Sequence, residues 1–421
     1  MSTPSVRGIQ YTEWSERPSE RGKRILVVGD CYGGLGDLFV SQKIIDCVKR
    51  ILLHPDNRFG YSVDFTLLLN GMSGRIPPDH PDSPAIAAAQ ETRHWEILDS
   101  AQTLQRLDDY AITIYFPYSG FIPDQLTNIA KEKLILVGEF GFFHSYLSET
   151  APGTCVTLGI SPRSNGVFVP EAYRDSDRLL RPRLLENRKT ELAQLPSQFH
   201  ALFPEEEDRL QQMSLHICYA HSPSVITAFM AAILQMKSSS ETVMFWCLFE
   251  PDEYLVRQII KESLKHTEYS CIELVDREGE IIPVKSAENP RLTCKIVFAP
   301  LFESSQKQSL INAANLETLV EGPSFLFECL YAGLVPFYRS PSHLNKLEEQ
   351  LLEAAFESQV SFPVFSRDNV TSFDVENRLH DVTGSENSLN RWRAFVQRII
   401  AFNHGRLEDK FRSLISRICR L

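Results

Sequence analysis

The chain has 421 residues, of which 43% are hydrophobic and 23% are charged, as in ordinary globular proteins of two or three domains. Its formal net charge of −11 argues against nucleic acid as the main partner. No run of 18 apolar residues appears and residues 1–23 lack an apolar segment, so the sequence predicts neither a membrane span nor a secretory signal.

The nine cysteines stand singly, without a Cys-x-x-Cys pair or a group of histidines beside them. This distribution argues against a zinc site and is typical of reduced thiols. We therefore expect a cytoplasmic protein, and export by a route without a signal sequence stays open as an alternative.

The N-terminal part of the chain predicts a parallel α/β sheet. After a polar tail over 1–22, a continuous apolar run at 24–29 is typical of a buried parallel strand. A glycine-rich turn over 30–37 and a helix over 38–53 follow it. Later strands alternate with helical or polar segments, which favours parallel pairing. These later strands are predicted at 63–69, 111–116, 133–137 and 155–158.

A second alternating series follows a connector over 171–212 that is rich in Arg, Asp and Glu. Its first helix is expected to begin at Pro223, with Ser222 as its N-cap. Strands are predicted at 214–219, 242–248, 271–275, 295–299 and 318–320, and helices at 223–236, 252–266, 304–314, 344–356 and 389–418.

The predicted fold class is therefore α/β, with two Rossmann-like domains that face each other across a cleft and C-terminal helices that close back on them. Two such domains usually bind a ligand between the carboxyl ends of their strands. The predicted limits are a flexible tail over 1–22, an N-terminal domain over 23–170, a connector over 171–212, a C-terminal domain over 213–390 and a C-terminal helix over 391–421.

The segment 320–338 is the most informative part of the sequence. It predicts a strand end, a tight loop of Glu321, Gly322, Pro323 and Ser324, a short helix and a stop at Gly333 before the next strand. A loop that opens onto a helix N-terminus offers free N–H groups and a positive dipole end to an anion. This pattern suggests an enzyme that uses a nucleotide-activated donor.

The turn over 30–37 carries the second candidate site. Gly33, Gly34 and Gly36 allow positive φ and a close approach of a ligand to the backbone. These glycines do not form the Gly-x-Gly-x-x-Gly pattern, which makes a dinucleotide oxidoreductase less favoured.

The two segments together resemble glycosyltransferases of the GT-B class. The closest family resemblance is to the protein-arginine rhamnosyltransferases that modify elongation factor P. Their Asp-Asn-Tyr-Gly-Asp loop is similar to 30–34, where Asp30, Tyr32 and Gly33 match and Gly34 replaces the second acid. Their Gly-Glu-Asp-Ser-Phe segment is similar to 321–325, where Ser324 and Phe325 match, Gly322 and Pro323 replace the acids, and the acid stands at Glu321.

The resemblance implies a nucleotide-sugar donor in the C-terminal domain and an acceptor, such as a protein arginine, at Tyr32, Gly33, Gly34 and Gly36. An inverting transfer needs a general base, for which Asp37 is the first choice and Asp30 the second. Their structural alternatives are a helix cap for Asp37 and a loop-capping carboxylate for Asp30. Glu321 is a third catalytic candidate, as a group that orients the acceptor or contacts the donor sugar.

Donor binding is assigned to Gly322, Ser324, Phe325 and Glu328. Ser324 is expected to contact a donor phosphate, together with the N–H groups of Ser324 and Phe325. Glu328 is expected either to bind a ribose hydroxyl or to face a neighbouring helix.

Neither candidate loop contains an Asp-x-Asp motif that would predict a metal site. Neither a metal nor another cofactor is therefore expected, and the charge of the donor would be offset by the helix dipole and basic side chains. Arg163 and Lys346 are the candidate basic side chains.

The sequence therefore predicts a metal-independent, inverting glycosyltransferase with a nucleotide-sugar donor and a protein side chain as acceptor. Two alternatives stay open. One is a nucleotide-sugar epimerase of the same architecture. The other is a catalytically degenerate scaffold that acts as a binding protein.

Overall fold

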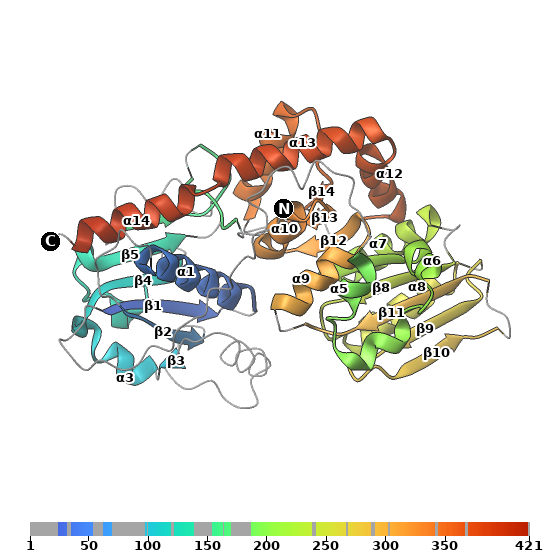
Figure 1. Cartoon of the computed structure of the whole chain (residues 1–421), viewed down its shortest axis with the longest axis horizontal. Coiled ribbons are helices and arrows are strands. Elements are labelled where there is room, and N and C mark those ends of the chain that lie inside the picture. Colours follow the sequence, from blue (N-terminus) through green and yellow to red (C-terminus); the bar gives the residue numbers. More distant parts are fainter. Residues whose placement is uncertain are drawn as a thin grey trace, which may run out of the picture.

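The structure is a computed structural model of the chain. It describes residues 24–31, 35–53, 62–69, 97–98, 100–118, 122–138, 154–162, 164–169, 187–237, 241–266, 268–287, 291–301, 304–341, 344–366 and 369–419. These residues form two α/β domains, each built on its own sheet (Figure 1). The predicted fold class, with two Rossmann-like domains and C-terminal helices that close back on them, is confirmed. The domain limits stay a prediction, because part of the connector lies outside the described residues.

The N-terminal sheet has six parallel strands in the order β3-β2-β1-β4-β5-β6. Residues 25–28 of β1 are fully buried, as their continuous apolar run predicts for a strand covered on both faces. The strands are β1 (Arg24–Cys31), β2 (Ser62–Leu69), β3 (Ile97–Leu98), β4 (Tyr110–Tyr118), β5 (Leu134–Gly138) and β6 (Thr154–Thr157). The helical elements are α1 (Leu35–Leu53), α3 (Ser100–Leu104) and the 3-10 helices η1 (Leu107–Asp109), η2 (Asp124–Leu126) and η3 (Lys131–Lys133).

Gly29 explains how closely α1 packs on the sheet. A Cβ at this position would lie 2.6 Å from Ser41 Oγ of α1 and 3.0 Å from the ring of Phe65 of β2. A larger residue would therefore push α1 away from β1 and displace the turn between them.

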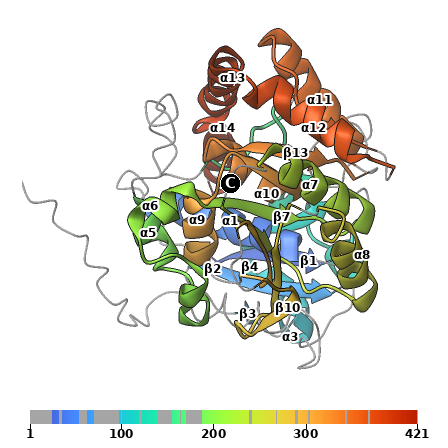
Figure 2. The same cartoon turned by 90° about the vertical axis from the view of Figure 1, so that its right-hand side faces the viewer.

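The C-terminal sheet has eight strands in the order β10-β9-β11-β8-β7-β12-β13-β14. Figure 2 shows it between α5, α6 and α9 on one side and α7 and α8 on the other. Helix α7 begins at Pro223, as predicted. The strands are β7 (Ser214–Tyr219), β8 (Thr242–Cys247), β9 (Cys271–Val275), β10 (Ile281–Lys285), β11 (Thr293–Phe298), β12 (Glu317–Glu321), β13 (Val335–Arg339) and β14 (Val364–Phe365). The helical elements are α5 (Arg188–Leu192), η6 (Ser197–Leu202), α6 (Glu207–Gln212), α7 (Pro223–Met236), α8 (Glu253–Ser263), α9 (Ser304–Ala313), α10 (Pro323–Tyr331), α11 (Asn345–Glu357) and α12 (Ser372–Thr383).

Strand β10 was not predicted and is the antiparallel edge of this sheet. Its first three residues are exposed and it contains Pro283, so it lacks the apolar run of a buried strand. Proline is tolerated at such an edge because one side of the strand has no ladder partner.

The helix predicted over 391–421 is two helices, α13 (Glu386–Asn403) and α14 (Arg406–Cys419). Helix α13 packs on the C-terminal domain, where Trp392 Nε1 donates to the carbonyl of Leu334 at 3.1 Å. Helix α14 lies on the N-terminal domain, and Arg417 Nη2 donates to Thr154 Oγ1 at 3.0 Å (Figure 1). The two helices therefore tie the domains together. Among the described residues, no helix is long and apolar enough to cross a lipid bilayer.

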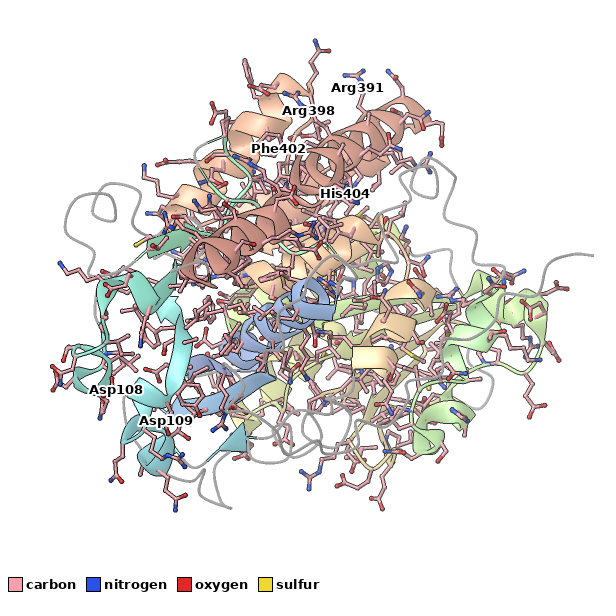
Figure 3. The ribbon with its side chains drawn as sticks, turned by 60° about the vertical axis from the view of Figure 1, so that its left-hand side comes forward. Asp108, Asp109, Arg391, Arg398, Phe402 and His404 are labelled. Carbon is pink, nitrogen blue, oxygen red and sulfur yellow. The ribbon has the colours of Figure 1, made fainter. Side chains whose placement is uncertain are left out.

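The domains also meet beside α11 and α13. The N–H of Ile160 donates to Gln350 Oε1 of α11 at 3.0 Å. A cavity of about 140 Å³ adjoins this contact, between residues 160–162, α11 and α13. Figure 3 shows two of its lining residues, Arg398 and Phe402, on α13.

Candidate active site at the two switch points

In each sheet the chain passes at one stage from one side of the first strand to the other. The N-terminal chain adds β2 and β3 on one side of β1 and then β4 on the other side. The C-terminal chain builds β8, β9, β10 and β11 on one side of β7 and then adds β12 on the other. In open α/β sheets, ligands bind outside the carboxyl ends of strands at such switch points. The two segments singled out in the sequence, 30–37 and 321–324, begin within the carboxyl ends of β1 and β12, and so both start at a switch point.

At the C-terminal switch point, α10 begins at Pro323 and Gly322 is its N-cap. Gly322 has φ +91°, a conformation that L side chains rarely adopt. Proline has no N–H, so Ser324 and Phe325 provide the first N–H groups of the helix. These groups precede the first intrahelical bond, which runs from Leu326 N to the carbonyl of Gly322. Ser324 therefore lies within the first turn, as the anion-binding prediction requires, although Gly322 is the cap.

Glu321, the last residue of β12, has both carboxylate oxygens in hydrogen bonds. Arg339 Nη1 at the end of β13 donates to Oε1 at 2.6 Å, and the backbone N–H of His221 donates to Oε2 at 2.6 Å. Burial opposes the charged form, but hydrogen bonds from the side chain and backbone of His221 and the charge of Arg339 outweigh it and lower the pKa of Glu321. Glu321 is therefore a carboxylate held at the carboxyl end of β12 by Arg339 and His221.

Glu328 lies one turn into α10 and is 9% exposed. Lys43 Nζ of α1 lies 2.8 Å from its Oε1, and Lys307 Nζ of α9 lies 2.8 Å from its Oε2. Lys43 Nζ also donates to Ser324 Oγ at 2.8 Å. Burial would raise the pKa of Glu328, but the two ammonium groups lower it to about 2. Lys43, Lys307, Ser324 and Glu328 are named the lysine–glutamate cluster below.

Phe325 is packed against its neighbours. It is 6% exposed, meets Tyr219 of β7 edge to face at 5.4 Å between ring centroids, and lies 5.8 Å below Lys307 Nζ. The side chain of Phe325 therefore serves packing, and only its backbone N–H lies at the start of the helix.

The two predicted acids of the N-terminal switch point, Asp30 and Asp37, differ in burial. Asp37 is the third residue of α1 and half-buried, so it lies in the first helical turn and not at the cap. Asp30 belongs to β1 and is fully buried, so it does not lie in the loop as predicted. Gly36 is also a residue of α1 and not of the turn. Tyr32, Gly33 and Gly34 lie outside the described residues.

The sequence prediction missed four charged or titratable residues that contact Ser324, Glu328 or Glu321: Lys43, Lys307, Arg339 and His221. Lys43 lies 281 residues from Ser324 in the sequence, and no local pattern marks that contact. Of the two predicted basic residues, Lys346 is bound to Glu349 on an exposed helix face, and Arg163 lies outside the described residues. In the described part of the chain, no group of three or more His, Cys, Asp or Glu is placed to hold a metal ion.

No family model and no curated protein matches the chain. A UDP-GlcNAc 2-epimerase from Neisseria meningitidis, bound to UDP-GlcNAc, is similar at 8% identity and a TM-score of 0.48, covering 94% of this chain and 100% of that one. A UDP-forming α,α-trehalose-phosphate synthase from Burkholderia vietnamiensis has 9% identity and a TM-score of 0.48, with 95% and 100% covered. The glycosyltransferase VinC, in complex with DTDP, has 10% identity and a TM-score of 0.44, with 94% and 100% covered. Identities this low give no information about the reaction.

Proposed function

We propose that the protein is a glycosyltransferase of the GT-B class that moves a sugar from a nucleotide-sugar donor to an acceptor. The supporting observation is the lysine–glutamate cluster at the start of α10. There the Ser324 hydroxyl, the first N–H groups of a helix and two ammonium groups lie together at a switch point. A diphosphate is the ligand group that needs this set of donors and positive charges.

The donor would bind through its phosphates at Ser324 and the N–H groups of Ser324 and Phe325. Ser324 Oγ accepts from Lys43, so its own hydrogen is directed elsewhere and can be donated to a phosphate oxygen. Glu328 would accept a donor hydroxyl while it holds the two lysines. Gly322 would let the donor come close to the backbone. The positive charges replace a metal ion in this proposal.

The acceptor would be deprotonated by Asp37 as it attacks the anomeric carbon, with inversion at that carbon. Asp37 lies six residues before Lys43 on α1, which is about 9 Å along the helix axis. Asp30 is the second choice, because it is buried inside β1. Glu321 is assigned to binding the donor sugar or orienting the acceptor, since its lowered pKa makes it a weak base.

The acceptor proposed is a protein side chain such as arginine, and the site of action proposed is the cytoplasm. The support for the acceptor is the resemblance of 30–34 and 321–325 to the protein-arginine rhamnosyltransferases.

The test measures thermal stabilisation and turnover with a panel of UDP-, dTDP- and GDP-sugars, and searches co-expressed proteins by mass spectrometry for an added sugar. Asp37→Asn should lower transfer by about 10²- to 10⁴-fold and leave donor binding intact, because only the proton acceptor is lost. Asp109→Asn is the matched control, since Asp109 (labelled in Figure 3) is exposed and pairs with the exposed Arg106.

Unchanged transfer in Asp37→Asn would remove Asp37 from the role of base. Conversion of a nucleotide sugar into its epimer without an acceptor would favour the epimerase alternative. A protein that neither binds nor turns over any donor in the panel would favour the scaffold alternative.

A further inference from the structure

Lys43 is the cluster member that comes from the other domain. It belongs to α1, whereas Ser324 and Glu328 belong to α10, and Figure 1 shows these two helices facing each other where the domains meet. Lys43 Nζ lies 2.8 Å from both Ser324 Oγ and Glu328 Oε1. Lys307, by contrast, reaches Glu328 from α9 of the same domain. The two lysines therefore differ in one respect, because only the contact of Lys43 depends on the distance between the domains.

The cluster has a positive balance of charge. Two ammonium groups face one carboxylate, so the three groups carry one net positive charge in a chain whose formal net charge is −11. The side chains of Lys43, Lys307 and Glu328 are 24%, 13% and 12% exposed, so solvent screens this charge only in part. The positive end of α10 adds to it. Ammonium groups beside a helix N-terminus favour an anionic ligand.

We propose that Lys43 is a phosphate-binding residue that the N-terminal domain contributes to the donor site, so that the site is complete only while α1 and α10 are bridged. This inference rests on the proposed function, and it adds the group that binds the diphosphate and the domain that supplies it. Any phosphate that receives the Ser324 hydroxyl would lie within reach of Lys43 Nζ, because that nitrogen already contacts the same oxygen.

The bridge also bears on the position of the domains. When α1 and α10 separate, Glu328 keeps only Lys307, and a largely buried carboxylate loses one of its two cations. That loss opposes opening in the absence of ligand. A phosphate bound at Ser324 would hold Lys43 from the other side and strengthen the bridge further.

The experiment compares Lys43→Met, Lys43→Arg and Lys307→Met. Titration calorimetry gives their affinities for UDP, dTDP and GDP, and small-angle scattering and hydrogen exchange over α1 and α10 give the bridging of the domains. Lys43→Met should lower the affinity for UDP, dTDP and GDP by the same factor, about tenfold, since all three share the diphosphate. It should also increase the radius of gyration and exchange in α10 without ligand, whereas Lys307→Met should weaken binding alone. Lys43→Arg should stay within about threefold of the wild type.

Arg50→Met is the matched control, because Arg50 lies seven residues further along the same helix and pairs with Glu408 of α14 instead of a residue of α10. It should leave the nucleotide affinities unchanged. If the wild type binds nucleotides and Lys43→Met binds them equally well, the inference is wrong and the proposed function stands. If the wild type binds none of the nucleotides, both the proposed function and the assignment of Lys43 to phosphate binding fail. Scattering and exchange would then still report whether Lys43 bridges the domains.

Discussion

A histidine, a glutamate and a cation lie together near each end of the neighbouring strands β7 and β12. The two groups contain similar residue types in different environments. The amino end has His216, Glu317 and Lys237, and the carboxyl end has His221, Glu321 and Arg339. Because the two strands are parallel neighbours in one sheet, the two sets are directly comparable.

The amino end is sealed. His216 is fully buried, its Nδ1 donates to the carbonyl of Glu317 at 2.9 Å, and its Nε2 accepts from Ser214 Oγ at 2.7 Å. One donated and one accepted bond satisfy a neutral imidazole. Burial lowers the pKa of His216 to about 4, although Glu317 favours the charged form. Lys237 Nζ donates to Glu317 Oε1 at 2.9 Å and completes the set.

The carboxyl end is open. The side chain of His221 is 72% exposed, and its Nδ1 lies 3.3 Å from Glu321 Oε2. The hydrogen bond to Glu321 raises the pKa of His221 and outweighs the opposing effect of burial. The pKa values of His216 and His221 are therefore shifted in opposite directions. The difference in burial therefore separates the two sets. The largely buried residues at the amino end are available only to one another, whereas the set at the carboxyl end, with the exposed His221, can reach a ligand. This more exposed set lies at the switch point.

The largest effect is expected at the sealed end. Glu317→Ala removes the anion that balances Lys237 beside a buried imidazole, and should lower the free energy of unfolding by about 3 to 5 kcal/mol. Denaturant titration measures this, with Glu250→Ala as the control because Glu250 pairs with Arg277 on the surface. Nucleotide binding per folded molecule should not change. A loss of binding at unchanged stability would mean that the sealed end is also part of the site.

The comparison also shows what the sequence reveals. Continuous apolar runs predicted the buried strands. The loop over 321–324 predicted that a helix starts there, although α10 begins at Pro323, inside the predicted loop. The roles of Glu317 and Glu321 could not be separated in this way, because both are acids at the ends of one short strand. Only the tertiary contacts place Lys237 beside one and Arg339 beside the other, and these contacts are 80 and 18 residues apart in the sequence. The bridge from Lys43 has the same origin.

The second effect concerns pH at the sealed end. The folded pKa of His216, about 4, lies below its unfolded value of about 6.5, so the unfolded chain binds more protons between these values. Stability from this group is therefore present above pH 6.5 and is lost as the pH falls toward 4, by about 3 kcal/mol in all. His216→Gln does not titrate and should flatten this part of the stability profile. His200 is exposed, so His200→Gln should retain the fall in stability between pH 6.5 and pH 4. If His216→Gln also retained this fall, His216 would not be its source.

The third effect tests the open end. Glu321→Gln keeps an acceptor for the His221 N–H but loses the charge that holds Arg339, which is only partly buried. We expect a loss of about 1 kcal/mol in unfolding free energy and a loss of about tenfold in donor affinity, the reverse of Glu317→Ala. Calorimetry and denaturant titration on the same preparation measure both. If stability fell as far as in Glu317→Ala while binding stayed intact, both ends would be structural.

The smallest effect is the pH dependence that His221 contributes. Its folded pKa is raised, so its pairing with Glu321 stabilises the protein fully below the unfolded pKa of about 6.5 and is lost as the pH rises through the folded pKa. Because the imidazole is largely exposed, solvent screening limits the contribution to about 0.5 kcal/mol. His221→Gln should therefore lower the free energy of unfolding at pH 6 relative to pH 8. His216→Gln should have the opposite effect and raise stability at low pH relative to high pH. Two variants that shift the profile in the same direction would show that the two ends of β7 do not differ as their burial indicates.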